Sequence, residues 1–131
     1  MWLLTLYDTM TNITFVIHGQ LPSGKNQVFI NGKGQRYPNA RFKAWKAEAL
    51  ATVKQQLHHV KLPLTNKVGL IVDYVPSDHR RRDVSGMLDA VCHLLEKAGV
   101  LVDDAQIKDC VWRSYEVDKD RSKATITVMG T

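Results

Sequence analysis

Carboxylates at the two ends of one predicted helix are the side chains of this sequence best suited to chemistry. Asp83 directly precedes an apolar helical pattern, and Asp103 and Asp104 follow shortly after that pattern ends. Carboxylates that converge from separate elements bind Mg²⁺, because this hard cation prefers oxygen ligands. With basic residues beside them, they indicate metal-assisted attack on a phosphodiester, in which the metal activates water and stabilises the leaving oxygen.

Each carboxylate also has a structural interpretation, and the sequence leaves both open. Aspartate is favoured at a helix N-cap because its side chain accepts hydrogen bonds from free backbone N–H groups, so Asp83 can cap the helix, bind metal or do both. The Asp103-Asp104 pair can equally be a polar turn that solvent screens. A helix over about 84–98 is about 22 Å long. Asp83 and Asp104 therefore meet only if the chain after Gly99 runs back toward the helix start.

Three consecutive arginines, Arg80, Arg81 and Arg82, lead straight into Asp83. Arginine binds phosphate in a bidentate manner and does not lose its charge. An arginine run at a helix start adds to the positive end of the helix dipole, which favours an arriving anion. The stretch therefore predicts a phosphate-binding loop, and a solvated charged loop is the alternative.

The elements that must position these residues follow from hydrophobic periodicity. Alternation over 12–18 and an almost continuous apolar run over 67–75 predict strands, the second one central and buried on both faces. Apolar residues at three- and four-residue steps predict one helix after Pro38-Asn39 and another over 84–98. Two short strands around Asn31-Gly32 and two closing strands complete the order βββαβαββ. We expect an α+β (mixed α/β) fold, a small domain with a mixed sheet and two helices packed on one face of it.

The composition indicates one folded and mildly basic domain. The chain has 131 residues, of which 44% are hydrophobic, and a formal net charge of +5, which is compatible with a polyanionic partner. Cys92 and Cys110 lack metal-site spacing and are expected to be reduced thiols of a cytosolic protein. With no run of eighteen apolar residues, we expect no membrane span. We interpret residues 1–9 as an N-terminal extension and 10–131 as the domain.

The segment RRRDVSGMLDAVCHLLEKAGVLVDDAQIKD resembles the core of the RusA family of Holliday junction resolvases. The family pattern is an arginine-rich loop, Asp-x-Asp-Asn, a helix with an early lysine, an Ala-Gly stop and Asp-Asp-Ala-Gln. NITFVIHGQLPSGKN is similar to the family's first strand and Pro-Ser-x-Asn loop, so the resemblance covers about residues 12–129.

This resemblance implies a small homodimeric nuclease that requires Mg²⁺, with Mn²⁺ as a substitute. It implies binding to branched DNA, namely four-way junctions, in which two strands are nicked symmetrically, in the cytoplasm of a bacterium or as a phage-encoded protein. The family's metal-binding aspartates carry over onto Asp83 and Asp104, with Asp103 as the neighbour of the latter, and these three are the expected catalytic and metal-binding residues. Arg80, Arg81 and Arg82 are the expected DNA contacts.

Two departures from the family pattern concern the same helix. The second aspartate of Asp-x-Asp-Asn falls on Ser85 and the asparagine on Gly86, while the early lysine falls on Asp89. Ser85 and Asp89 are four residues apart and share a helix face, so Asp89 can reach toward the missing carboxylate. Lys25 is a candidate replacement for the lysine and a candidate DNA contact. Asp73, late in the central strand, is a further spare carboxylate.

Two functions follow, and they differ in whether DNA is cut. In the first, Asp83, Asp104 and either Asp103 or Asp89 hold Mg²⁺ for junction cleavage in recombination and repair. In the second, the missing ligand at Ser85 leaves a catalytically weakened protein that binds branched DNA without cleaving it. A basic domain with no nucleic-acid role is a third alternative, and it predicts no salt-dependent DNA affinity.

Overall fold

The structure is a computed structural model, and it describes residues 12–24, 28–30 and 32–130. Within these described residues, the α-helices are α2 (Ala40–Gln56) and α3 (Val84–Lys97), and a short 3₁₀ helix, η2 (Asp104–Gln106), follows α3. The strands are β1 (Asn12–His18), β2 (Val28–Ile30), β3 (Arg36–Pro38), β4 (Val68–Val75), β5 (Ile107–Ser114) and β6 (Lys123–Gly130). The predicted α+β class and the order βββαβαββ are confirmed, and η2 is an addition that the sequence did not predict.

Four strands form one mixed sheet in the order β1-β6-β4-β5. The β1–β6 and β4–β6 pairs are antiparallel, whereas β4 and β5 are parallel, with Val68 opposite Ile107 at their starts. Parallel neighbours need a crossover connection, and α3 is that connection. Since β5 starts beside the start of β4, the chain after α3 does not run back toward the start of that helix.

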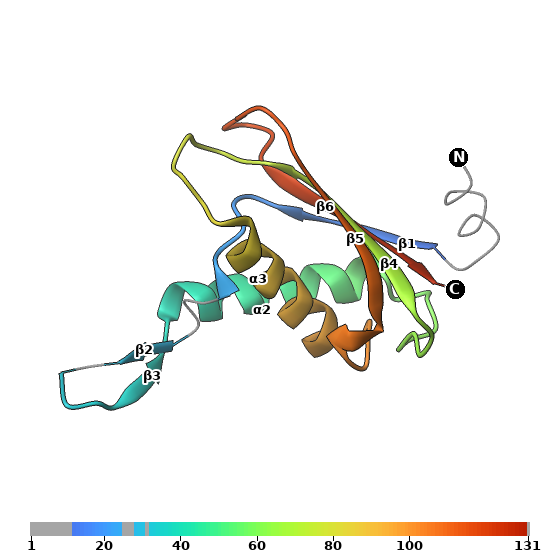
Figure 1. Cartoon of the computed structure of the whole chain (residues 1–131), viewed down its shortest axis with the longest axis horizontal. Helices are drawn as coiled ribbons and strands as arrows, with labels where there is room; N and C mark the ends of the chain where they lie inside the picture. The colour runs from blue at the N-terminus through green and yellow to red at the C-terminus, as the bar shows by residue number, and fades with distance from the viewer. Residues whose placement is uncertain (1–11, 25–27, 31, 131) are drawn as a thin grey trace.

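Both helices lie on the same side of this sheet (Figure 1). The core between the helices and the sheet is largely apolar. Its buried members from the helices are Ala49, Val53, Met87, Val91, Leu94 and Leu95, and those from the strands are Ile13, Phe15, Ile17, Val68, Leu70, Val72, Tyr74, Ala124, Ile126 and Val128. The prediction that β4 is buried on both faces is wrong in part. Its odd positions Ile71, Asp73 and Val75 are only half-buried, because no described helix covers the second face.

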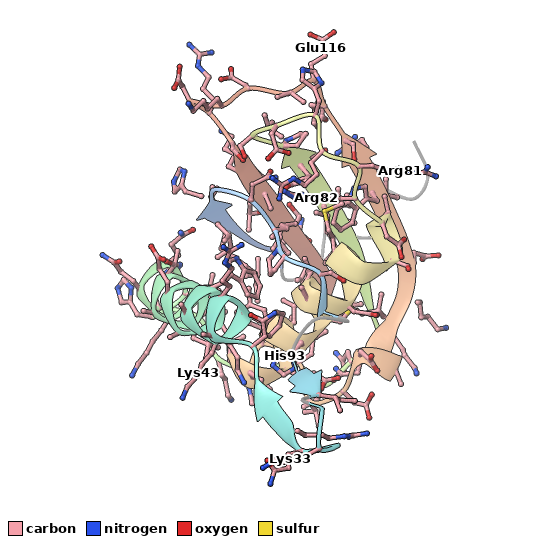
Figure 2. All side chains as sticks on the ribbon, turned by 90° about the vertical axis from the view of Figure 1, so that its left-hand side faces the viewer. Lys33, Lys43, Arg81, Arg82, His93 and Glu116 are labelled. Atoms are coloured by element: carbon pink, nitrogen blue, oxygen red, sulfur yellow. The ribbon has the colours of Figure 1, made fainter. Side chains whose placement is uncertain are left out.

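The short strands β2 and β3 pair antiparallel as a separate hairpin, as predicted. The hairpin extends away from the sheet and leads directly into α2 (Figure 1). Lys33 lies toward its far end, opposite the end of the molecule that carries Glu116 (Figure 2). None of the helices in the described part of the chain has the length and apolar character needed to cross a membrane. The predicted extension, residues 1–9, lies outside the described residues.

Candidate active site

Asp83 is the N-cap of α3, as predicted. Its Oδ1 accepts a hydrogen bond from the Ser85 backbone N–H at 3.0 Å. The Ser85 hydroxyl also donates to the Asp83 carboxylate, with distances of 3.1 Å to Oδ1 and 3.0 Å to Oδ2. Ser85 therefore replaces the carboxylate of the family pattern with a hydrogen-bond donor to Asp83, and the pair presents three exposed oxygen atoms at the start of α3.

Gly86, where the family pattern has asparagine, allows a close approach between α3 and the loop after β1. A Cβ at Gly86 would lie 2.4 Å from the Ser23 Oγ, and a Cβ at Gly24 would lie 2.7 Å from the Ala90 backbone nitrogen. Any side chain at Gly86 would have to displace Ser23. The close packing of this loop on α3 therefore explains why glycine, and not asparagine, stands at position 86.

The other end of α3 carries an acidic group formed by Glu96, Asp103 and Asp104. One ligand atom of each lies within 4.8 Å of the others, and all three residues are exposed. The Asp104 backbone N–H donates to the Glu96 Oε1 at 2.8 Å, which holds η2 against the last turn of α3. Oxygen atoms at this spacing suit a hard divalent cation, which takes carboxylate ligands at slightly more than 2 Å.

Asp103 is oriented by a capping box at the start of η2. Its Oδ1 accepts from the Ala105 N–H at 2.8 Å, while the Gln106 Oε1 accepts from the Asp103 N–H at 3.0 Å. The Gln106 Nε2 in turn donates to the carbonyl oxygens of Leu64 and Asn66 at 2.8 and 2.9 Å. The predicted polar turn is thus real, and it orients the carboxylates rather than excluding a metal role for them.

Hydrogen bonds, and then neighbouring charges, set the ionisation of the acidic group. A hydrogen bond shared with Asp103 raises the pKa of the Asp104 carboxyl, and burial and the charges of Glu96, Asp103 and Asp89 add to this effect. A hydrogen bond from the Ala105 N–H lowers the pKa of the Asp103 carboxyl, and the hydrogen bond between Asp103 and Asp104 lowers this pKa as well. Glu96 also lies in the last turn of α3, where the helix dipole is negative. Negative charge is therefore concentrated here, and a bound cation would relieve it.

Asp89 lies between the two ends of α3, on the helix face that also carries Ser85, Cys92 and Glu96. Its charge helps to raise the pKa of the Asp104 carboxyl and the pKa of the Cys92 thiol. Burial is the first cause of the Cys92 shift, to about 12, followed by the charge of Asp104, so this thiol stays protonated at neutral pH. Asp89 is thus electrostatically part of the acidic end of the helix.

Asp83 is not a member of the acidic group. It precedes Glu96 by thirteen residues, an axial rise of about 20 Å. The structure therefore brings Asp103 and Asp104 together with Glu96, which sequence reasoning missed, and places Asp83 at the opposite end of α3. A signal for Glu96 existed, because an acid in the last helical turn opposes the helix dipole and this one shares a face with Asp89.

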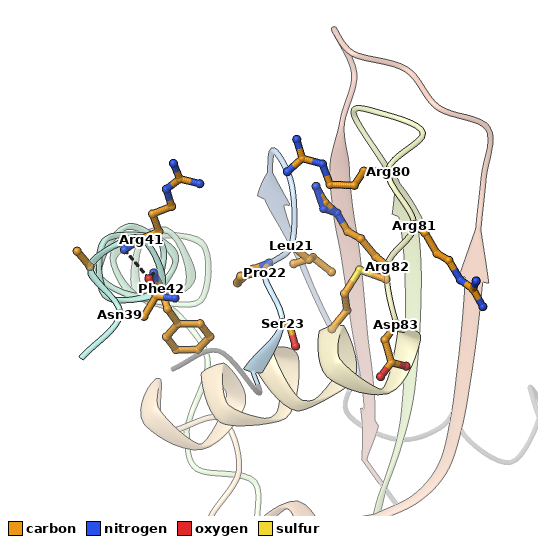
Figure 3. A pocket seen from close by; sticks show the side chains of 12 residues that line it. Leu21, Pro22, Ser23, Asn39, Arg41, Phe42, Arg80, Arg81, Arg82 and Asp83 are labelled. Atoms are coloured by element: carbon orange, nitrogen blue, oxygen red, sulfur yellow. Dashed lines mark hydrogen bonds between the residues drawn. The ribbon is translucent and has the colours of Figure 1, made fainter. Parts of the chain in front are cut away.

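Of the remaining candidates, the arginines lie at the Asp83 end of α3. Figure 3 shows Arg80 and Arg82 extending toward Leu21 and Pro22, whereas Arg81 points away from them. Arg82 forms an ion pair with Asp78 at 3.5 Å. Lys25 lies outside the described residues, so its predicted roles stay predictions.

Asp73, the spare carboxylate in β4, belongs to a different network. It accepts from the Arg113 Nε at 2.6 Å, from the Arg113 Nη2 at 3.1 Å and from the Tyr115 hydroxyl at 2.9 Å. The hydrogen bond and the charge of Asp73 both raise the pKa of Arg113 further. Asp73 is therefore engaged in a structural ion pair between β4 and β5.

Comparison with known proteins decides the family. The model of the family described as endodeoxyribonuclease RusA matches residues 20–129. The chain belongs to the RusA family. One RusA-family relative, the crossover junction endodeoxyribonuclease RusA of Escherichia coli strain K12, is 30% identical over 118 residues, covering 89% of this chain and 97% of the relative. A second, from Enterobacteria phage 82, is 30% identical over 110 residues, covering 83% and 90% of the two chains.

The family resemblance predicted from the segment between Arg80 and Asp109 is thereby confirmed. This RusA-family chain keeps carboxylates at Asp83, Asp103 and Asp104 but lacks the one expected at Ser85. Its additional carboxylates on the same helix face are Asp89 and Glu96, and only Glu96 has a ligand atom within 4.8 Å of both Asp103 and Asp104.

Proposed function

We propose that this chain is a Mg²⁺-dependent endodeoxyribonuclease that cuts four-way DNA junctions by phosphodiester hydrolysis. Family membership supports the nuclease activity, and the relatives named above are crossover junction endodeoxyribonucleases. The observation that carries the metal dependence is the acidic group, in which three exposed carboxylates offer oxygen atoms within 4.8 Å of one another. Oxygen donors of this kind suit Mg²⁺, with Mn²⁺ as a substitute.

Asp104, Asp103 and Glu96 are the residues that would hold the metal. A bound Mg²⁺ supplies activation of water and stabilisation of the leaving oxygen. The protein's own contribution is to hold the three carboxylates in place, through the Asp104 N–H to Glu96 hydrogen bond and the capping box of η2. Asp83 stays a proposed catalytic and metal-site residue on the family resemblance, at the other end of α3, where its carboxylate and the Ser85 hydroxyl form a second group of oxygen atoms.

The arginine loop, Arg80 to Arg82, is proposed to hold the DNA backbone. Arginine forms charge-assisted and often bidentate hydrogen bonds with phosphate. Replacing all three arginines with alanine is expected to weaken junction binding and to flatten its dependence on salt, because each lost phosphate contact reduces the number of counterions released. An unchanged slope of log K against log salt would place this loop away from the DNA.

A synthetic four-way junction tests the activity itself. With Mg²⁺ or Mn²⁺, the protein is expected to nick two strands symmetrically, whereas Asp104→Asn is expected to bind the junction without nicking it. A linear duplex of the same sequence is the matched substrate control. Binding without nicks at any metal concentration would leave the alternative function, a RusA-like protein that binds branched DNA without cleaving it.

Symmetric nicking also needs two active sites. We propose a homodimer, on the family resemblance, acting in the cytoplasm of a bacterium or of a phage-infected cell. Sedimentation equilibrium of the protein alone and of the junction complex tests the assembly. A monomer in both states would contradict the homodimer and leave the nuclease proposal in place.

A further inference from the structure

A basic groove with a volume of about 760 Å³ lies between the starts of α2 and α3. Three segments that are far apart in the sequence form it: the loop after β1, the first turn of α2 and the arginine loop with the start of α3. The lining residues are Leu21, Pro22, Ser23, Asn39, Ala40, Arg41, Phe42, Arg80, Arg81, Arg82, Asp83 and Met87.

Arg41 lies on the α2 side of this groove, and the arginine loop lies on the other side. Figure 3 shows its guanidinium group on the α2 side and those of Arg80 and Arg82 on the opposite side, with Leu21 and Pro22 between them. Arg41 is exposed and lies in the first turn of α2, beside the N-cap residue Asn39. Arg41 does not stand out in the sequence, because thirty-eight residues separate it from the arginine loop.

The groove carries an excess of positive charge. Among the described residues that line it, four are arginines and one, Asp83, is an acid. The Arg82 Nη2 pairs with Asp78 at 3.5 Å, whereas its buried Nε has no hydrogen-bond partner within the part of the chain that the structure describes. A donor of this kind costs free energy unless an acceptor arrives, and the acceptor that matches several arginines is an anion with many oxygen atoms.

Two helix starts add to this positive field. The Asn39 Oδ1 accepts from the backbone N–H groups of Arg41 and Phe42, and the first turns of α2 and α3 contain no acidic residue. The positive ends of both helix dipoles therefore meet at one groove, where α2 has the neutral N-cap Asn39 and α3 has the carboxylate of its N-cap Asp83.

The floor of the groove is held in place before any ligand binds. Leu21, Phe42 and Met87 are buried beneath it. The Leu21 N–H donates to the Tyr74 hydroxyl at 3.2 Å, and that hydroxyl donates to the Gln20 Oε1 at 2.6 Å. These bonds tie the loop after β1 to β4, so a ligand meets a preformed site and binding requires little ordering of the floor.

We infer that Arg41, on the α2 wall of the groove, is a further DNA-binding residue of this nuclease. It contacts a backbone phosphate across the groove from Arg80 and Arg82. The ligand is the phosphodiester backbone of a DNA strand, whose consecutive charges match arginines on two opposed walls. This inference rests on the proposed function and extends it, because it assigns a DNA contact to α2, an element outside the family's arginine and aspartate segment.

The test compares Arg41→Ala with Lys54→Ala in binding to a labelled four-way junction without divalent metal. Lys54 lies in the last turn of the same helix, about 20 Å along its axis, and both substitutions remove one positive charge from an exposed position. We expect Arg41→Ala to lower affinity at 100 mM salt several-fold and to reduce the slope of log K against log salt by about 0.9. Lys54→Ala is expected to leave that slope unchanged. Arg41→Lys is expected to retain part of the slope that Arg41→Ala loses.

A scan with neutral methylphosphonate linkages identifies the phosphate. Neutralising one backbone position is expected to weaken binding of the unmodified protein and to have no further effect on Arg41→Ala. If Arg41→Ala and Lys54→Ala have the same slope, and no position shows this loss of sensitivity, the inference about Arg41 is overturned. If the unmodified protein itself binds the junction without salt dependence, the proposed function fails instead.

Discussion

Asp83 combines a structural and a predicted chemical role, and the two can be separated by one substitution. Its Oδ1 caps α3 through the Ser85 N–H, and asparagine is as good an N-cap as aspartate. Asp83→Asn is therefore expected to leave the melting temperature nearly unchanged. Cleavage of a four-way junction is expected to be lost, and junction binding is expected to be kept or strengthened because a negative charge beside the arginine loop is removed.

Asp83→Ala is the matched control for this prediction, since it also removes the cap and is expected to cost about 1 kcal/mol of stability. Gel assays of nicking and binding, with thermal unfolding of both variants, make the comparison. Normal cleavage by Asp83→Asn would remove Asp83 from the catalytic residues.

Ser85 stands where the family pattern has its second aspartate, and its hydroxyl donates hydrogen bonds to both Asp83 carboxylate oxygens. Ser85→Asp would remove that donor and place a second carboxylate beside the first. We expect the variant to be less stable than the natural chain in EDTA, because the two like charges repel, and to recover with Mg²⁺. Junction cleavage is expected to be equal or higher. A large loss of cleavage would mean that the site is built around the serine.

At the scale of elements, the packing of the loop after β1 on α3 depends on glycine. A Cβ at Gly24 would lie 2.7 Å from the Ala90 nitrogen and 2.8 Å from the Asp89 Cβ, which are too close for any side chain. Gly24→Ala is therefore expected to lower the free energy of unfolding by about 1–3 kcal/mol, a typical cost of overpacking.

Gly32 in the β2–β3 hairpin provides the control for this substitution, since a Cβ there meets no atom within 4 Å. Gly32→Ala is expected to change stability by no more than about 0.5 kcal/mol. Chemical denaturation of both variants is the measurement. Equal stability of Gly24→Ala and the natural chain would show that the loop moves off α3 at little cost.

The elements themselves were largely predictable, and their pairing was not. α3 has a strong apolar stripe and a recognisable start at Asp83, so periodicity and capping located it. Periodicity carries no information on which strand pairs with which. The parallel register of β4 and β5, which separates Asp83 from Asp104, was therefore accessible only in the structure. Glu96 and Arg41 were missed for the same reason, because their partners are brought to them by the fold.

On the scale of the whole molecule, α3 links two sites of opposite charge. The basic groove lies at its start and the acidic group at its end, about 20 Å apart along the helix. Each like-charged cluster repels itself in the folded protein, so each is expected to be stabilised by its own ligand: DNA phosphate at one end and a divalent cation at the other. Binding of ligands to the folded state alone raises its stability in proportion to the logarithm of ligand concentration.

Metal-linked stability therefore tests the acidic group without reference to cleavage. At a Mg²⁺ or Mn²⁺ concentration one hundred times the Kd, one site that exists only in the folded protein adds about 2.7 kcal/mol. The melting temperature of the natural chain is expected to rise with metal. Glu96→Gln is expected to reduce this rise, because it removes one carboxylate charge from the group of three while keeping the size of the side chain.

Glu116→Gln is the matched control, because Glu116 is exposed in the loop before β6 and is not a member of the acidic group. It removes the same charge and is expected to retain the full metal-dependent rise. Differential scanning calorimetry over a metal titration distinguishes the two variants. The same rise in both would show that Glu96 takes no part in holding the ion. Absence of any rise in the natural chain would mean that its folded state does not hold the metal before DNA binds, because the linkage acts through the folded protein alone.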